Sequence, residues 1–274
     1  MSKKRVLLLG ASGFLGSCLT QLAPRDVELV LGYRRRSDKF GKFRNIALDL
    51  ASAMTDLQSK MLKKINPHVV IHAARIEPFD QDPKRAKIIT ERLAKIVKAL
   101  GSRFIYISSD AVFDGKKGNY SEKEKPHPVT NYGKAKLAAE TAIRKYFKSN
   151  YVIVRPSYIY SDDPNKLDKR TALLVSELRA GKHFFLFSDM YRSPILITDL
   201  VRAIWKLATS DFSGIVHVAG KRQSVYAFSR AVLKNLDMSQ HSVSPDSIKN
   251  SKGNFVADTS LNTRFARKLL DVTK

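Results

Sequence analysis

Short runs of apolar residues alternate with longer amphipathic segments over the first half of the chain. The runs are continuously apolar, which is typical of strands whose two faces are both buried in a parallel sheet. Between the runs, apolar residues recur at the three- and four-residue spacing of a helix face. The predicted strands are residues 6–9, 27–31, 46–48, 68–72, 104–107 and 151–154, and the predicted helices begin at residue 14 and cover 54–65, 83–100 and 131–148.

This alternation predicts an α/β fold with a doubly wound, parallel (Rossmann) sheet. After Pro156 the alternation loosens. The elements predicted beyond this point are helices over 171–180, 198–209 and 224–235, with short strands near 184–187 and 215–218. We therefore expect a Rossmann domain over residues 1–156 and a smaller substrate-binding region over 157–274, partly interleaved with the first domain.

A glycine turn joins the first predicted strand to the first predicted helix, with Gly10, Gly13 and Gly16 at a spacing of three. In a dinucleotide site the first glycine permits a tight turn, the second lets the backbone approach a pyrophosphate, and the third allows close helix–strand packing. The helix N-terminus offers N–H groups and a positive dipole end to phosphates. The predicted cofactor contacts in this turn are Gly10, Ser12, Gly13, Phe14, Leu15 and Gly16.

A P-loop is the nearest alternative to a dinucleotide site. It requires Gly-Lys-Ser/Thr at its end, whereas Gly16 is followed here by Ser17 and Cys18. Without a lysine to reach the β- and γ-phosphates, nucleoside-triphosphate chemistry is excluded. An ordinary strand–turn–helix with incidental glycines stays open on the spacing alone.

The end of the second predicted strand indicates which dinucleotide binds. An acidic residue there would bind the ribose 2′-hydroxyl of NAD. Residues 32–36 instead read Gly-Tyr-Arg-Arg-Arg, and a guanidinium suits the 2′-phosphate of NADP. We therefore expect NADP(H) to be preferred over NAD(H), with Arg34 and Arg35 as contacts. A solvated basic loop is the alternative, because further basic residues follow.

Two residue pairs at later strand ends are also predicted to contact the cofactor. Asp49 and Leu50 follow the third strand, where residues commonly flank an adenine ring. Ala73 and Ala74 follow the fourth strand and are small enough for the cofactor to lie against the backbone.

Composition bounds the other classes of function. No apolar run approaches the ~20 residues that span a bilayer, and residues 1–4 lack a signal-peptide layout, so we expect a cytoplasmic protein without membrane partners. The single cysteine excludes an internal disulfide. His68 and His72 lie ~13 Å apart along a strand, too far to share a metal ion, so no metal site is predicted.

The net charge is strongly positive, with 49 Lys and Arg against 25 Asp and Glu, or +24. Such a surplus attracts anions. The chain has no paired Cys/His ligands and no aromatic-rich ribonucleoprotein motif, so we expect phosphorylated small molecules rather than nucleic acid as partners. Anionic small molecules account for only part of the excess.

Tyr132 and Lys136 stand four residues apart and share one face of a predicted helix. A free tyrosine has a pKa near 10, and an adjacent ammonium favours the phenolate and lowers that pKa. The pair can therefore pass a proton to a carbonyl oxygen while a nicotinamide passes hydride to the carbon. Ser109, at the end of the fifth strand, can hydrogen-bond the same oxygen. A surface helix pair is the alternative.

These motifs resemble the extended short-chain dehydrogenase/reductases. Residues 108–115, Ser-Ser-Asp-Ala-Val-Phe-Asp-Gly, resemble the Ser-Thr-Asp-Tyr-Val-Phe-Asp-Gly stretch of dTDP-4-dehydrorhamnose reductases. Other stretches are also similar to sequences of this group of reductases. They are residues 128–136 together with Glu140, residues 154–160, Pro194 together with residues 199–200, and residues 214–220. The resemblance covers nearly the whole chain.

The resemblance implies roles for individual residues. Ser109, Tyr132 and Lys136 would form the catalytic triad, with Tyr132 protonating the C4 keto oxygen of a nucleotide-linked deoxysugar. Lys136 would also bind the nicotinamide ribose, and a homodimer is among the assemblies that the sequence allows. Further cofactor contacts would be Ser108, Pro156 and Ser157, and the substrate contacts would be Arg75, Asp110, Ala111, Val112, Tyr158 and Arg192.

Departures from the family pattern fall on the substrate side. The family tyrosine after Asp110 is Ala111 here, its tryptophan is Tyr158, and residues 75–78 read Arg-Ile-Glu-Pro instead of Tyr-Thr with an acidic cluster. Two alternatives therefore stay open. The regulatory β subunit of methionine adenosyltransferase shares these motifs and implies a binding partner without catalysis, and a nucleotide-sugar epimerase or dehydratase would recycle its cofactor.

Overall fold

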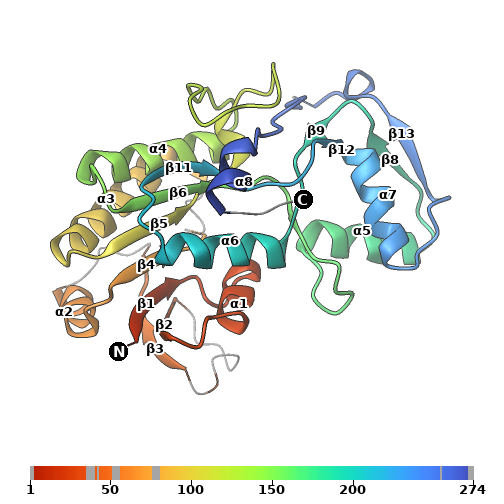
Figure 1. The fold of residues 1–274 in the computed structure, drawn as a ribbon. Helices are drawn as coiled ribbons and strands as arrows, with labels where there is room; N and C mark the ends of the chain where they lie inside the picture. The colour runs from red at the N-terminus through yellow and green to blue at the C-terminus, as the bar shows by residue number, and fades with distance from the viewer. Residues whose placement is uncertain are drawn as a thin grey trace.

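The structure, a computed structural model, describes residues 3–34, 41, 43–50, 56–75, 81–253 and 255–270. At its centre lies a seven-stranded sheet in the order β11–β6–β5–β4–β1–β2–β3, and every neighbouring pair is parallel (Figure 1). This confirms the predicted fold class. The strands are β1 (Lys4–Leu9), β2 (Val27–Tyr33), β3 (Arg44–Ala47), β4 (Val69–His72), β5 (Arg103–Ile107), β6 (Tyr151–Arg155) and β11 (Gly214–His217).

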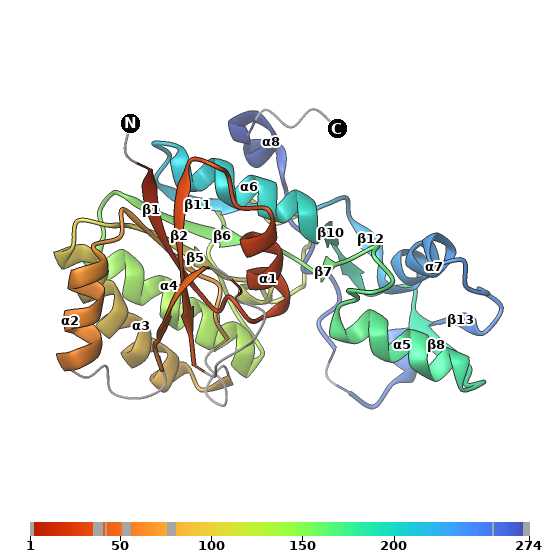
Figure 2. The ribbon, with the colours of Figure 1, turned by 90° about the horizontal axis from the view of Figure 1, so that it is seen from below.

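Helices cover both faces of this sheet (Figure 2). One layer holds α1 (Phe14–Gln21), α6 (Ile197–Thr209) and α8 (Arg264–Leu270), and the other holds α2 (Asp56–Ile65), α3 (Pro83–Ala99) and α4 (Asn131–Tyr146). Alternate residues of β1 serve the two layers: Val6 and Leu8 pack with the first, and Leu7 and Leu9 with the second. Burial on both faces explains why the strand is continuously apolar.

Local signals set the ends of α3 and α4. The Asp82 carboxylate accepts a hydrogen bond from the Arg85 backbone N–H at 3.0 Å and begins α3. Thr130 caps α4, and its hydroxyl accepts a hydrogen bond from the Gly133 N–H at 3.0 Å. A Cβ on Gly133 would lie 2.0 Å from the Ala111 carbonyl oxygen, so this glycine lets α4 approach the end of β5 closely.

A smaller unit stands beside the sheet and has its own apolar cluster, built on Val175, Leu178, Leu233 and Val243 (Figure 1). It consists of α5 (Lys169–Arg179), α7 (Val225–Asn235), β8 (Phe184–Phe187) and β13 (Val243–Asp246). Four short strands form two further pairs. β7 (Ile159–Tyr160) pairs with β10 (Ile195–Leu196), and β9 (Tyr191–Arg192) pairs with β12 (Gln223–Ser224). The 3₁₀ helices are η3 (Asp110–Val112) and η4 (Ile248–Asn250).

Two elements that follow residue 156 in the sequence pack with the large sheet. The strand predicted near 215–218 is β11, which pairs with β6, and α6 packs in the layer of α1. The Trp205 indole N–H of α6 donates to the Leu19 carbonyl of α1 at 3.2 Å. A four-residue apolar run carries no information about its pairing partner, so the sequence pattern could not show that β11 pairs with β6.

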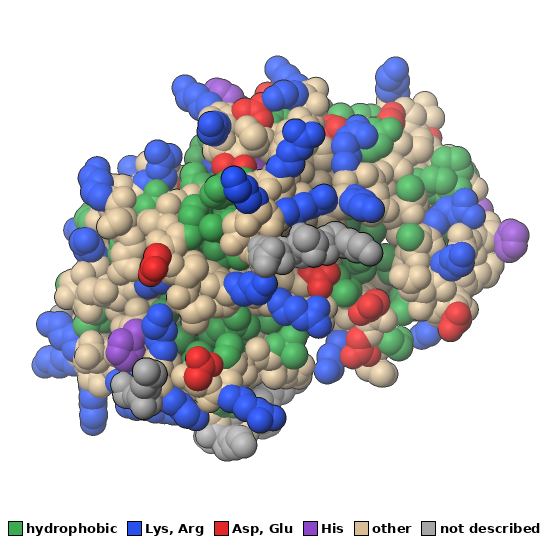
Figure 3. Space-filling view, viewed as in Figure 1, with side chains coloured by type: hydrophobic (Ala, Val, Ile, Leu, Met, Phe, Trp, Pro, Cys, Tyr) green, Lys and Arg blue, Asp and Glu red, His purple; other side chains and the backbone are tan. Residues whose placement is uncertain are grey.

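Lys and Arg side chains are spread over the visible face of the molecule and outnumber the acidic ones there (Figure 3). On α3 and α4 the exposed cations include Lys87, Lys95 and Arg144. Glu91 is half-buried and pairs with Lys145 at 3.4 Å. Within the described residues, no helix is both long enough and apolar enough to cross a membrane.

Candidate cofactor and substrate site

Two adjoining cavities open where β1, β2, β4 and β5 end. One, of about 770 Å³, is lined by the glycine turn and is called the glycine-turn cavity. The other, of about 610 Å³, is lined by Ser109 and is called the Ser109 cavity. Ligands of open α/β sheets bind at this carboxyl edge. The residues that line both cavities are Arg75, Ser108, Tyr132, Ile159 and Arg170.

The glycine turn has room for backbone only. Gly10 has a φ of +88°, and a Cβ there would lie 2.5 Å from the Cα of Ala74. A Cβ on Gly16 would lie 2.0 Å from the Gly10 carbonyl oxygen, so Gly16 shapes the turn from behind and does not line the cavity. Gly13 is the N-cap residue of α1 and has no side chain with which to cap that helix. The turn and the α1 N-terminus thus fit a pyrophosphate, as in dinucleotide sites.

Most residues predicted to contact the cofactor line the glycine-turn cavity. They are Gly10, Ser12, Gly13, Phe14, Leu15, Arg34, Asp49, Leu50, Ala73, Ala74, Ser108, Tyr132 and Lys136. Pro156 and Ser157 line the Ser109 cavity instead. Arg35 lies outside the described residues.

Tyr132 and Lys136 project from the first turns of α4 toward the junction of the cavities. The Lys136 ammonium donates to the Ile107 carbonyl at 3.0 Å and lies 5.6 Å from the centre of the Tyr132 ring. It also lies 5.1 Å from the centre of the Tyr106 ring. The backbone of β5 and two aromatic rings therefore hold one cation beside Tyr132.

Ser109 lies in the second cavity with its hydroxyl already engaged. Its Oγ donates to the Asp110 carboxylate at 3.0 Å and accepts from the Ala111 N–H at 3.2 Å, which begins η3. Ser109 and Tyr132 both line the Ser109 cavity, whereas Lys136 lines the glycine-turn cavity. Tyr132 is thus the member of the predicted triad that faces both spaces.

Asp110 was predicted to bind substrate, but its carboxylate oxygens accept hydrogen bonds from hydroxyl groups of the protein. Its Oδ2 accepts hydrogen bonds from the hydroxyls of Ser157 and Thr259, both at 2.8 Å, and its Oδ1 accepts from Ser109. The Ser157 hydroxyl also accepts from the Ser193 N–H at 3.1 Å. Asp110 therefore ties together the ends of β5 and β6 and the C-terminal segment, and it borders the Ser109 cavity as a positioning residue.

Of the other residues predicted to bind substrate, all but Val112 line a cavity. Ala111 and Tyr158 line the Ser109 cavity, and Arg75 lines both cavities. Arg192 also lines the Ser109 cavity, but it is buried and donates to the carbonyls of Tyr191, Val256 and Ala257. Val112 was wrongly predicted to contact substrate. It is fully buried with Phe113, Tyr120 and Leu261 because η3 turns its side chain into this apolar cluster.

A buried ion pair that was not predicted from the sequence supports the end of β5. Glu140 of α4 and Arg155 of β6 are 2% and 1% exposed, and their charged atoms lie 2.6 Å apart. The Ser108 hydroxyl donates to the same carboxylate at 2.5 Å. Sequence similarity pointed to Glu140, but only the fold brings it to Ser108 and Arg155.

His217 completes this buried network. Burial and the nearby Arg155 charge lower the pKa of His217 to about 3, so its ring is neutral at physiological pH. The Arg155 guanidinium lies 3.4 Å from Nε2, and Nδ1 lies 3.0 Å from the Tyr120 carbonyl oxygen. These partners assign the proton to Nδ1, because a guanidinium can only donate and a carbonyl can only accept.

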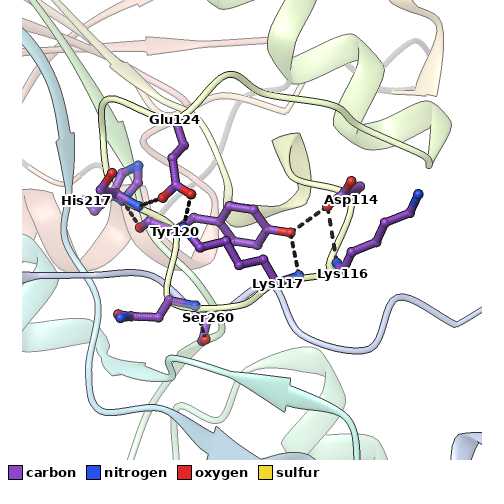
Figure 4. A network of polar contacts seen from close by, with 9 residues as sticks. Asp114, Lys116, Lys117, Tyr120, Glu124, His217 and Ser260 are labelled. Carbon is purple, nitrogen blue, oxygen red and sulfur yellow. Dashed lines mark hydrogen bonds and ion pairs between the residues drawn. The ribbon is translucent and has the colours of Figure 1, made fainter.

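The loop after η3 is held to the body of the protein by polar contacts (Figure 4). The Tyr120 hydroxyl donates to Asp114 at 2.5 Å and accepts from the Lys117 N–H at 3.1 Å. The hydrogen bond from Tyr120 holds the pKa of Asp114 below its usual value. The Asn119 N–H donates to the Ser260 hydroxyl at 2.8 Å. Of these contacts, only that between Asn119 and Ser260 joins segments distant in sequence, and Ser260 directly follows Thr259, which lines the Ser109 cavity.

Arg170 was also missed by the sequence analysis. It is exposed near the start of α5, and its guanidinium carbon lies 3.5 Å from the centre of the Tyr158 ring. The basic pair at residues 169–170, directly after the Asp168 cap of α5, was the only signal in the sequence.

The family model for the RmlD substrate binding domain matches residues 4–267, and the chain belongs to this family. The methionine adenosyltransferase 2 subunit beta of Rattus norvegicus is 34% identical over 235 residues, covering 80% of this chain and 68% of that protein. The predicted resemblance to both groups is thus confirmed at the level of the family.

Solved structures show the same fold. A hypothetical dTDP-4-dehydrorhamnose reductase from Sulfolobus tokodaii is 29% identical with a TM-score of 0.80, covering 97% of this chain and 94% of that one. The dTDP-4-dehydrorhamnose reductase of Bacillus anthracis, solved in complex with NADP, is 24% identical with a TM-score of 0.80, covering 97% of this chain and 93% of that one.

Proposed function

We propose that this protein is an NADPH-dependent reductase of the 4-keto group of a nucleotide-linked deoxysugar. The observation that carries the proposal is the position of Tyr132, which lines both cavities with Lys136 on one side and Ser109 on the other. A dinucleotide in the glycine-turn cavity and a ketone in the Ser109 cavity would meet at this side chain. The 29% identity to the hypothetical dTDP-4-dehydrorhamnose reductase from Sulfolobus tokodaii supports this assignment.

The bound nicotinamide would supply the hydride for this reduction. Tyr132 would donate its phenolic proton to the carbonyl oxygen as the carbon is reduced, which leaves a phenolate on the protein. The Lys136 ammonium, held by Ile107, would stabilise that negative charge. Ser109 would hold the carbonyl oxygen with its hydroxyl proton, which it would then withdraw from Asp110.

Arg34 supports the preference for NADPH. It is exposed after the end of β2 and lines the glycine-turn cavity, where the adenosine ribose of a bound dinucleotide would lie. Asp49 lies in the same cavity, beside the position proposed for adenine.

The test is a turnover assay with NADPH and dTDP-4-keto-6-deoxy-L-mannose, followed by the absorbance of the reduced nicotinamide. We expect net oxidation of NADPH, and oxidation that is about 10²–10⁴-fold slower in the Tyr132→Phe variant. Conversion of the sugar without net oxidation would instead identify an epimerase.

A regulatory subunit is the second candidate, favoured by the 34% identity to the rat methionine adenosyltransferase subunit. It predicts tight binding of NADP without turnover of any nucleotide sugar. Affinity purification of the tagged protein from its own cells, followed by mass spectrometry, would then have to recover a methionine adenosyltransferase.

A further inference from the structure

We propose that Arg170, stacked on Tyr158, is an anion subsite that binds the diphosphate of the substrate. This inference rests on the proposed function, because it assigns the subsite to a nucleotide-linked sugar. Arg170 belongs to the smaller unit, yet it lines both cavities at their junction. The subsite therefore joins the smaller unit to the site at the carboxyl edge of the sheet.

The charge around the Ser109 cavity favours an anion. Arg75, Arg170 and Arg192 line it, and Asp110 is the one carboxylate among its described lining residues. Asp110 is 6% exposed, and both of its oxygens accept hydrogen bonds from hydroxyl groups of the protein. The described lining of the cavity thus carries an excess of positive charge, which attracts anions.

The arginines of this cavity are not equivalent. The Arg192 guanidinium donates hydrogen bonds to the backbone carbonyls of residues 191, 256 and 257. Arg170 has no ion pair or side-chain hydrogen bond with any described residue, and its contact is the face of the Tyr158 ring. Stacking uses the flat face of a guanidinium and leaves its N–H edges for a ligand.

This geometry suits a phosphate. A guanidinium presents a planar fork that can donate two parallel hydrogen bonds to phosphate oxygens. The Tyr158 ring restricts the side chain before the ligand arrives, which lowers the entropy lost on binding. The glycine turn and the N-terminus of α1 would bind the pyrophosphate of the dinucleotide. Arg170 would therefore bind the diphosphate of the substrate.

The experiment compares Arg170→Ala with the wild type in the turnover assay. We expect the KM for the nucleotide sugar to rise about ten- to a hundred-fold, as for loss of a charge-assisted hydrogen bond, while kcat and the Kd for NADPH change by less than about threefold. Arg170→Lys should recover only part of the loss, because an ammonium lacks the planar fork. Arg179→Ala is the matched control, since it removes the same charge from the exposed far end of α5.

Three outcomes would overturn the inference. The first is an equal KM increase in the Arg170→Ala and Arg179→Ala variants, which would indicate only a general effect of net charge. The second is a weaker Kd for NADPH with an unchanged KM for the sugar, which would assign Arg170 to the cofactor. The third is an unchanged KM.

Failure of the proposed function can be separated from failure of the subsite. Calorimetric titration of dTDP into the NADP-bound protein needs no turnover. Tight dTDP binding that Arg170→Ala weakens about ten-fold or more would support the diphosphate subsite even in a protein that reduces no sugar. Equal affinities for dTDP in the wild type and the variant, or no dTDP binding by the wild type, would refute it.

Discussion

The two cavities are built in different ways. The glycine-turn cavity takes its shape from backbone that is local in sequence, with Gly10 and Gly16 allowing contacts that any side chain would block. The Ser109 cavity takes its shape from side-chain hydrogen bonds between distant segments, such as that from Thr259 to Asp110, which are 149 residues apart. The glycine-turn cavity can therefore bind the same class of ligand in many proteins. The specificity of the Ser109 cavity can change when its side chains are substituted.

Replacement of Tyr132 should have the largest effect and should distinguish turnover from cofactor binding in the glycine-turn cavity. We expect Tyr132→Phe to lower kcat about 10²–10⁴-fold, the usual contribution of a positioned proton donor. The Kd for NADPH should stay within about threefold, because the glycine-turn cavity keeps its backbone shape. Stopped-flow turnover and fluorescence titration of NADPH measure the two effects. Near-normal kcat in the variant would rule out Tyr132 as the acid.

Loss of the Glu140 charge should damage both cavities, because this carboxylate supports their shared wall. Glu140→Gln leaves Arg155 buried without its partner, and we expect a loss of about 3–5 kcal/mol in the free energy of unfolding, measured by urea denaturation. Glu91→Gln is the control, since it breaks the more exposed pair with Lys145 and should cost much less. Similar losses in the two variants would contradict the structural role of the buried pair.

Arg34→Ala should affect the glycine-turn cavity alone. We expect the affinity for NADPH to fall about ten- to a hundred-fold, the contribution of one charge-assisted hydrogen bond, with little change for NADH. Added salt should reduce the difference between the cofactors in the wild type, because the extra contact is ionic. Calorimetric titration of both cofactors checks this.

The control for Arg34 is Arg44→Ala, which removes an exposed charge that lines neither cavity. Equal weakening of NADPH and NADH by Arg34→Ala would move the side chain to the adenine or the pyrophosphate.

A further expected effect is a pH dependence of stability from two buried histidines beneath the site. Burial, with nearby Lys136 for His72 and Arg155 for His217, lowers both pKa values from 6.5 to about 3. Between these values the unfolded chain binds more protons than the folded one. Stability is therefore fully present above about pH 6.5 and falls with decreasing pH, by about 1.4 kcal/mol per pH unit for each histidine.

Urea denaturation between pH 7 and pH 5 measures this slope. His72→Leu should remove about half of it, whereas replacement of the exposed His241 by Ala should leave it unchanged. A slope that His72→Leu does not alter would mean that His72 is not held neutral in the folded protein.

Much of the fold was predictable because its signals are local. Continuous apolar runs identified the strands, and a spacing of three glycines identified the turn, since both depend on neighbours within a few residues. The spacing of Tyr132 and Lys136 likewise placed them on one helix face. The end of the fifth predicted strand located Ser109, and resemblance to known reductases then implied its role in the triad.

The tertiary structure decided what depends on contacts between distant segments. It placed β11 in the large sheet beside β6, turned Val112 into the core and occupied Asp110 with Ser157 and Thr259. It also laid Arg170, which belongs to no motif, on the ring of Tyr158. The physical reason is that burial and hydrogen-bond partners are set by which segments pack together, whereas a sequence pattern reports only the preference of each segment by itself.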